Sequence, residues 1–468
     1  MSFQLDSLVI SGKEVLPIIE GGKGIGVSSG RSSGAFASAG AVGTFSGVNA
    51  DRYDETGNVK KEIYHGKTRR ERHEELIAMG IEGGIAQARI AHELAGGRGP
   101  IHINILWEMG GAQRILEGIL DSTKGLIHGV TCGAGMPYRL AEIAAKYQIY
   151  YYPIVSSMRA FRALWKRAYH QASQWLGGVV YEDPWLAGGH NGLSNSEDPL
   201  IFQDPYPRVV ELRKFMNEVG LQNVPVVMAG GVWHLKDWEH WLKNHEIGPV
   251  AFQFGTRPIL TQESPVSDAW KKKLMTLKEG DVLLQRFSPT GFYSSAVRNN
   301  FIIELEQRSN RQIRYSTTPV VEENLTEALP VGARGRPVYV TKESLAKVLL
   351  WKEQGFDETM KTPDSTLIFV TAEKAQEIHK DQVDCMGCLS GCLFSNWQDH
   401  GNYTTGRKAD PRSFCIQKTL QEVIHGGDVE NQLMFSGHNA YKFATDSFYE
   451  NGFVPTIQQL VNRIAIGY

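Results

Sequence analysis

Short apolar runs alternate with helical patterns through the first half of the chain. The runs span residues 16–20, 42–46, 101–106, 126–131, 150–155, 178–181, 224–229 and 250–254. Most are continuously apolar, as expected for parallel strands that helices cover on both faces. Between the runs, helical patterns occupy residues 69–94, 137–147, 158–176 and 207–219. Eight βα units in about 245 residues predict an α/β fold, a (β/α)8 TIM barrel, with its active site at the carboxyl ends of the strands. An open, doubly wound sheet is the alternative.

The regular alternation stops near residue 260. Residues 264–278 have a helical pattern, and a helix-rich tail follows, interrupted by a group of cysteines. We predict a barrel at residues 1–262, a small barrel-associated subdomain at 263–345 and an α-rich C-terminal extension at 346–468.

The charge of the chain is nearly balanced. Its 468 residues include 49 Lys and Arg against 51 Asp and Glu, a formal net charge of −2. This balance gives no electrostatic reason to expect nucleic acid or an anionic membrane surface as a partner. The first residues lack the pattern of a signal peptide, and no apolar stretch reaches the length of a membrane span. We expect a cytoplasmic protein that acts on a small molecule.

Glycine or polar residues follow several predicted strands, where a barrel places its active site. Gly230-Gly231 and Gly255-Thr256 follow the seventh and eighth strands. Barrels often hold a phosphate there on backbone N–H groups. The two turns together predict a cofactor that carries a phosphate.

A glycine-walled turn after the sixth strand presents one histidine. Residues 187–192 read Ala-Gly-Gly-His-Asn-Gly. Glycine adopts positive φ and lets the backbone approach a bound ring or phosphate. His190 stands where a general base or a cofactor contact would be needed. The alternative is an ordinary polar histidine in a strand-to-helix turn.

These motifs occur in an order that resembles a known family. The segments that carry the likeness are residues 17–24, 38–44, 187–192, 229–232 and 253–257, with Asn104 on the third strand and weaker matches at 288–291 and 298–299. Over about residues 10–300 the chain resembles the nitronate monooxygenase (2-nitropropane dioxygenase-like) family of FMN-dependent barrels. That group also contains FMN-type enoyl-acyl-carrier-protein reductases.

The resemblance implies FMN at the mouth of the barrel and an oxidoreductase that oxidises small nitronate or carbanion-type substrates. His190 would be its catalytic acid or base, because flavin chemistry needs a side chain that manages the substrate proton. The turns after the last two strands would bind the phosphate, and Asn104 and Gln253 would lie near the ring or the ribityl chain. The implied cofactor-binding residues are Gly22, Lys23, Asn104, Asp183, Gly188, Gly189, Gly230, Gly231, Gln253, Gly255 and Thr256.

The sequence departs from the family pattern near the flavin. Lys23 stands where the family usually has Met, and Asp183 and Leu186 stand where Gln and Glu are common. Lys23 either stabilises an anionic reduced flavin or is a solvated loop lysine. These departures affect the expected identity of the substrate more than the expected binding of FMN.

Four of the five cysteines fall within a short stretch of the tail. Cys385, Cys388 and Cys392 form a C-x2-C-x3-C pattern, and Cys415 follows. Disulfides are disfavoured in the cytosol, so metal binding is the leading interpretation. The spacing resembles the iron–sulfur segment of flavin barrels of the 2,4-dienoyl-CoA reductase and trimethylamine dehydrogenase kind, and predicts a [4Fe–4S] cluster. A zinc site or a metal-free tail are the alternatives.

The fourth ligand and the remaining cysteine leave further choices open. Cys415 is the expected fourth ligand, with His400 or Cys132 as alternatives. Cys132 ends the fourth strand and is either near the flavin or a small buried thiol.

A cluster would change the expected reaction. Nitronate oxidation needs no external electron donor, whereas a reductase of an enoyl thioester or another activated alkene could take electrons through the cluster from a ferredoxin-like partner. A third hypothesis is a redox sensor that catalyses no reaction. Separately, the long tail is compatible with a homodimer.

Overall fold

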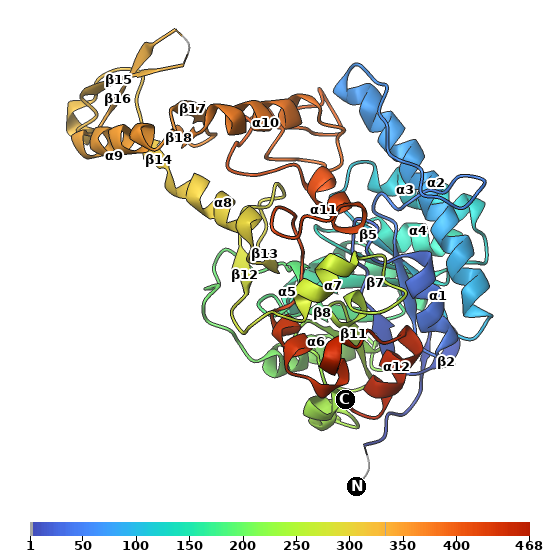
Figure 1. The fold of residues 1–468 in the computed structure, drawn as a ribbon. Helices are drawn as coiled ribbons and strands as arrows, with labels where there is room; N and C mark the ends of the chain where they lie inside the picture. The colour runs from blue at the N-terminus through green and yellow to red at the C-terminus, as the bar shows by residue number, and fades with distance from the viewer. Residues whose placement is uncertain (1–2, 333) are drawn as a thin grey trace.

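Eight parallel strands form a closed barrel in the computed structural model, which describes residues 3–332 and 334–468. The strands are β3 (Ile18–Glu20), β4 (Gly43–Ser46), β5 (Ile101–Leu106), β6 (Gly129–Gly133), β7 (Tyr150–Val155), β8 (Val179–Glu182), β10 (Val226–Ala229) and β11 (Val250–Phe254). Their order is β3-β11-β10-β8-β7-β6-β5-β4, and a parallel bridge between Ile19 and Val42 closes the ring. This arrangement confirms the predicted TIM barrel (Figure 1).

An outer layer of helices surrounds the barrel. It contains α1 (Gly30–Ser38), α2 (Arg69–Ala95), α3 (Ala112–Ser122), α4 (Leu140–Tyr147), α5 (Met158–Arg167) and α6 (Pro205–Glu218). The capping box of Thr68 and Glu71 begins α2, and left-handed Gly96 ends it, as expected for helix termini. The predicted helix over residues 158–176 is shorter, because Ala168 leaves the helical conformation and the 3-10 segment η1 (Tyr169–Trp175) follows.

Short segments replace helices after the last two barrel strands, and a hairpin covers the opposite end of the barrel. The segments η2 (Leu235–Trp241) and η3 (Arg257–Ile259) follow β10 and β11. The hairpin consists of β1 (Leu8–Ile10) and β2 (Lys13–Val15), and its turn residue Ser11 bonds the buried side chains of His102 and Tyr152.

A small sheet stands beside the barrel mouth. It joins β12 (Val282–Gln285) and β13 (Ser294–Val297) to the two-residue strand β9 (Gly189–His190). The helices α7 (Asp268–Leu274) and α8 (Asn300–Asn310) flank it in sequence.

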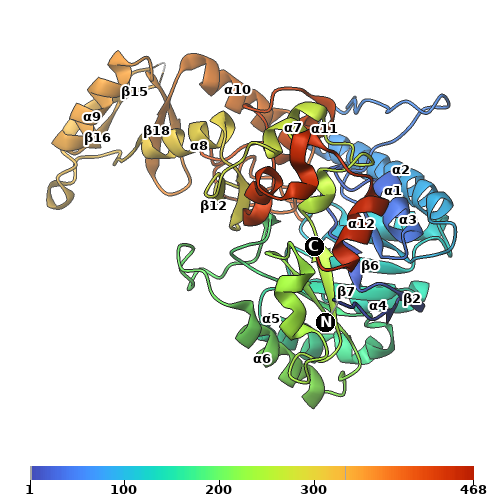
Figure 2. The same cartoon turned by 60° about the horizontal axis from the view of Figure 1, so that its bottom comes forward.

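Residues 312–383 form an arm that projects from the barrel (Figures 1 and 2). Its elements are β14 (Gln312–Arg314), η4 (Val321–Glu323), β15 (Glu327–Val331), β16 (Arg336–Val340), α9 (Lys342–Glu353), β17 (Glu358–Lys361), β18 (Thr366–Val370) and α10 (Ala372–Val383). The sequence predicted a helix-rich tail. The structure adds two short strands there, β17 and β18, which pair antiparallel.

The remaining residues return to the barrel mouth. They include α11 (Ile416–His425), η5 (His438–Ala444), η6 (Ser447–Gly452) and α12 (Ile457–Ala465). The last helix packs against α1. None of the helices in the described ranges is long and apolar enough to cross a membrane.

Candidate active site

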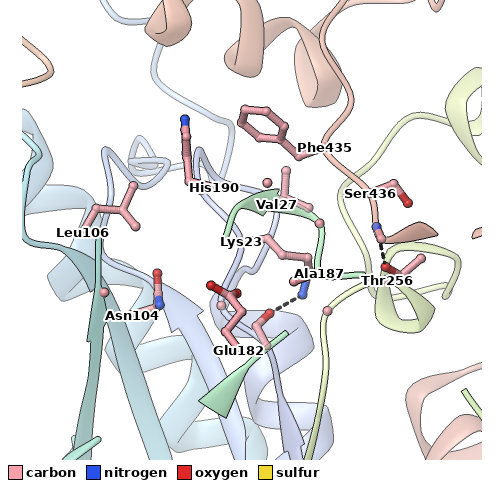
Figure 3. A pocket seen from close by; sticks show the side chains of 18 of the residues that line it. Lys23, Val27, Asn104, Leu106, Glu182, Ala187, His190, Thr256, Phe435 and Ser436 are labelled. Carbon is pink, nitrogen blue, oxygen red and sulfur yellow. Dashed lines mark hydrogen bonds between the residues drawn. The ribbon is translucent and has the colours of Figure 1, made fainter. Parts of the chain in front are cut away.

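A cavity opens at the carboxyl ends of the barrel strands. The turns that follow the strands build one wall, and the C-terminal extension builds the other. Of the residues predicted to bind the cofactor or act in catalysis, those that line the cavity are Gly22, Lys23, Asn104, Gly188, Gly189, His190, Gly230, Gly231, Gln253, Gly255 and Thr256. The structure thus brings residues spread over more than 200 positions to one site (Figure 3).

His190 is fixed in place by the small sheet and by the extension. It pairs with Ser294 of β13, and its Nε2 atom lies 2.6 Å from Ser288 Oγ. Ser288 Oγ in turn lies 2.9 Å from Thr290 Oγ1. The ring of Phe435 contacts the imidazole edge-to-face at 5.2 Å between centroids. Loss of hydration lowers the pKa of His190 to about 4, so the ring is neutral at pH 7, with one nitrogen that accepts a proton and one that donates.

Lys23 reaches into the cavity from the turn after β3. Its Nζ donates to the carbonyl oxygen of Gly21 at 2.6 Å and lies 3.7 Å from Glu20 Oε1. Burial raises the pKa of Glu20 and lowers that of Lys23, while their mutual attraction opposes both shifts. Because the Lys23 side chain is only 15% exposed, it is a paired cavity residue and not a solvated loop lysine.

Two neighbouring carboxylates at the end of β8 have different positions. Glu182, which the sequence analysis did not single out, lines the cavity. Burial, and then the charge of Asp183, raise the pKa of Glu182 to about 8, so this carboxyl is protonated at pH 7. Asp183 does not line the cavity: its Oδ1 accepts from the backbone N–H groups of Trp185 and Leu186, each at 2.8 Å. Asp183 therefore shapes the turn that leads to His190.

The turns after β10 and β11 leave room and donors for a phosphate. Gly230 and Gly231 have φ of +84° and +76°. Gly230 packs closely against the turn before His190, since a Cβ on it would lie 2.9 Å from Ala187 Cβ. A Cβ on Gly255 would meet no atom within 4 Å. Among the described residues, the backbone N–H groups of Gly231, Gly255 and Thr256 donate to no protein group. Unused N–H donors beside open space fit the phosphate of FMN.

The opposite wall is an apolar surface that the sequence analysis did not predict. We call it the apolar cap; it comprises the side chains of Leu389, Ile416, Leu420, Val423, Leu433, Met434 and Phe435. The same tail continues through Ser436, Gly437 and Asn439, which also line the cavity. No sequence motif marks these residues, because their role depends on where the chain returns after the arm.

The four tail cysteines lie near one another at the edge of the cavity. Cys388 lines the cavity, and its pKa is raised well above the usual range by burial and then by the charges of Cys415, Cys392 and Cys385. Within residues 3–332 and 334–468, however, no group of three or more His, Cys, Asp or Glu side chains is arranged to hold a metal ion. The geometry therefore gives no support to the predicted [4Fe–4S] cluster or to zinc.

The two alternative ligands have other partners. His400 is exposed and bonds Asp399 and Gln398. Cys132 is fully buried in β6, does not line the cavity, and contacts the carbonyl oxygen of Gly133 at 3.9 Å. Its position is that of a small buried thiol.

Comparisons with known proteins agree with this geometry. The sequence model described as nitronate monooxygenase matches residues 103–368, whereas no curated protein matches the chain. FabK from Thermotoga maritima is similar in structure with a TM-score of 0.50 and 14% identity, over 96% of this chain and 91% of that chain. The enoyl reductase domain of MlnA, from the macrolactin biosynthesis cluster of Bacillus amyloliquefaciens, is similar with a TM-score of 0.52 and 12% identity, over 96% of this chain and 93% of that chain.

The fold and the site thus define an enzyme of the TIM-barrel oxidoreductase class. More narrowly, the chain belongs to the nitronate monooxygenase family, which matches more than half of its length, and FMN is the cofactor expected for that family.

Proposed function

We propose that this protein reduces an activated alkene such as an enoyl thioester, with FMN as cofactor. The observation that carries the proposal is the apolar cap, which faces the barrel turns and places Phe435 against His190. A long apolar wall suits an acyl chain, whereas a small, charged nitronate would leave most of it without a partner. The enoyl reductase domain of MlnA has a similar fold over 96% of this chain, which is compatible with the proposal.

The chain supplies the binding and proton-handling groups of this reaction. Bound FMN supplies two-electron chemistry as a hydride carrier. The backbone N–H groups of Gly231, Gly255 and Thr256 would hold its phosphate. Neutral His190 directs its N–H at the thioester carbonyl oxygen, where negative charge develops as the alkene is reduced. Glu182 donates a proton to the α-carbon of the substrate. Its carboxyl can do so because it is protonated at pH 7. The apolar cap excludes water from the reacting carbons.

The reducing equivalents come from outside the chain. A reduced nicotinamide dinucleotide is a two-electron donor of the required kind. The predicted [4Fe–4S] cluster would instead receive single electrons from a ferredoxin-like protein, and it stays a prediction. Iron and acid-labile sulfide, assayed in protein purified without oxygen, test it: about four of each per chain support the cluster, and their absence refutes it.

The direct test of the reductase function uses FMN-loaded protein whose flavin has been reduced with dithionite under anaerobic conditions. Addition of crotonyl thioester should reoxidise the flavin and yield butyryl thioester in equal amount. A reduced flavin that persists with crotonyl thioester, in protein whose flavin reacts with oxygen, would contradict the proposal.

The family match favours a second function, the oxidation of alkyl nitronates. A nitronate is already deprotonated, so His190 would act as a general base only where the neutral nitroalkane is the substrate. The same protein with oxidised FMN should then consume oxygen on addition of propane-2-nitronate. Oxygen uptake without reduction of crotonyl thioester would establish this function in place of the first.

A further inference from the structure

Lys23 is a positive charge that lines the cavity and that the proposed reaction does not use. Among the described residues that line the cavity, it is the only Lys or Arg. Figure 3 shows its side chain between the labelled residues of the cavity. An ammonium group that is only 15% exposed has lost much of its hydration, so it requires negative charge or hydrogen-bond acceptors nearby.

Glu20 supplies negative charge from outside the cavity. Its Oε1 atom lies 3.7 Å from Lys23 Nζ. The same carboxylate accepts from Ser32 Oγ at 2.9 Å and from the backbone N–H of Thr44 at 3.2 Å, and such bonds favour its charged form. Glu20 is 1% exposed and does not line the cavity. The ion pair therefore presents its positive member to the cavity.

The Lys23 side chain is fixed by its own turn. Its Nζ atom donates to Gly21 O at 2.6 Å, and Ser28 Oγ donates to the same oxygen at 3.2 Å. The backbone closes the turn, since Ser28 N donates to Lys23 O and Lys23 N donates to Ser28 Oγ, each at 3.0 Å. An ammonium group has three N–H donors. With one on Gly21 O and the Glu20 carboxylate beside it, at least one donor remains for a ligand in the cavity.

The neighbours of this turn indicate which part of FMN would meet the ammonium group. The phosphate has unused backbone donors after β10 and β11, and the flavin ring would then occupy the rest of the cavity. The Lys23 turn borders both regions. A Cβ on Gly21 would lie 3.0 Å from Gly255 Cα, and a Cβ on Gly22 would lie 2.2 Å from Asn104 Cβ. Reduction leaves negative charge on the flavin ring, and a cation beside the ring stabilises it.

We propose that Lys23 tunes the flavin: its ammonium group stabilises the negative charge that the ring acquires on reduction, and so raises the reduction potential of bound FMN. A hydride from the nicotinamide donor carries two electrons and one proton, so it converts the neutral ring to a singly charged anion. The proposal rests on the FMN dependence of the proposed function and adds a residue that sets its redox equilibrium.

The test is the reduction potential of FMN bound to the full-length protein, measured by anaerobic titration against a reference dye. In Lys23→Met the ratio of the dissociation constants of oxidised and reduced FMN should fall at least about tenfold, which lowers a two-electron potential by about 30 mV. Glu20 then stays behind either neutral or negative, and neither form replaces the lost positive charge. Lys23→Gln repeats the test with a polar side chain if Lys23→Met does not fold. An unchanged potential would overturn the proposal, even if the variant melted at a lower temperature.

A matched control is Lys271→Met. Lys271 is also buried, with Nζ bonded to Ser264 O at 3.0 Å, but it does not line the cavity. Its variant should keep the wild-type potential; an equal fall in both variants would refute a specific role of Lys23.

Riboflavin, which lacks the phosphate, tests the other possible partner of Lys23. The dissociation constants of oxidised FMN and oxidised riboflavin should change by the same factor in Lys23→Met. A loss confined to FMN would assign Lys23 to the phosphate and overturn the proposal. Wild-type protein that binds no flavin would refute the proposed function and this inference together. Bound FMN with an unchanged potential in Lys23→Met would refute the inference alone.

Discussion

The two walls of the cavity differ in composition and in origin. The barrel wall consists of glycine-rich turns that expose backbone N–H groups, together with His190 and Lys23. The opposite wall is the apolar cap, which comes from residues 389–435 and carries no charged side chain. Backbone donors suit a phosphate and a flavin, whereas apolar side chains suit a carbon chain and exclude water.

On the proposed function, the two walls would have separate tasks. The barrel turns would hold FMN, and their positions follow from the barrel itself. The apolar cap would contact the carbon chain of the substrate.

The largest effect should come from His190, whose titratable ring lies between the two walls. We expect His190→Asn to lower turnover about 10²–10⁴-fold while FMN stays bound, because it removes the group that manages the substrate proton. Turnover and flavin content are measured on the same preparation. His438→Asn is the control, since His438 is also bonded to a serine, with its pKa lowered to about 4, but does not line the cavity. Similar losses in both variants would argue against a specific role of His190.

Two glycine substitutions distinguish the open space for the cofactor from the close contact between the two walls. Gly255→Ala adds a methyl group to open space, so apoprotein stability should change by less than about 0.5 kcal/mol, while FMN affinity falls at least about tenfold. Gly188→Ala drives a methyl group into the tail at Gly437 and should destabilise the apoprotein by about 1–3 kcal/mol. Thermal melting without flavin and fluorescence titration with FMN measure the two effects. Equal melting temperatures for the two variants would contradict the close packing of the tail.

Shortening a side chain of the apolar cap should change substrate preference. Leu420→Ala removes buried apolar surface worth about 1.5–3 kcal/mol, so the KM for an eight-carbon enoyl thioester should rise about tenfold, and that for a four-carbon one less than twofold. Val461→Ala in α12 is the control, because Val461 is buried outside the cavity. An unchanged preference in Leu420→Ala would show that the acyl chain does not lie against the cap.

The pH dependence of kcat/KM tests the protonation state of Glu182. Activity should fall as the pH rises through about 8, where Glu182 loses the proton that the substrate takes up. Glu182→Gln should remove this alkaline limb and lower kcat/KM at pH 7 about 10²–10⁴-fold, because an amide has no proton to give. An alkaline limb that persists in this variant would assign it to another group.

The sequence predicted the barrel wall well because its signals are local. The boundaries of β5, β7 and β11 match the apolar runs at 101–106, 150–155 and 250–254, since a strand covered on both faces must be apolar throughout. The turns after β10 and β11 followed from the strand count. By contrast, β17 and β18 were missed because they are short and lie between helices, so their pairing depends on partners elsewhere in the chain.

The sequence did not show which of two adjacent side chains enters the cavity. Glu182 and Asp183 are adjacent, yet only Glu182 enters the cavity, because alternate residues of a strand point to opposite sides. The cysteine spacing favoured a [4Fe–4S] cluster over zinc or a metal-free tail. The geometry of the described residues does not support the cluster, since spacing limits the reach of thiols but does not orient them.

The sequence alone determined the barrel, the place of the cofactor turns and the presence of His190 at the mouth. The hydrophobic pattern of each strand and the order of the turns along the chain can be read from the sequence itself. Only the tertiary structure decided that the tail returns after the arm to form the second wall, with Phe435 on His190 and Ser436 beside Thr256. Contacts between residues about 180–250 positions apart depend on the path of the whole chain, and no local pattern records that path.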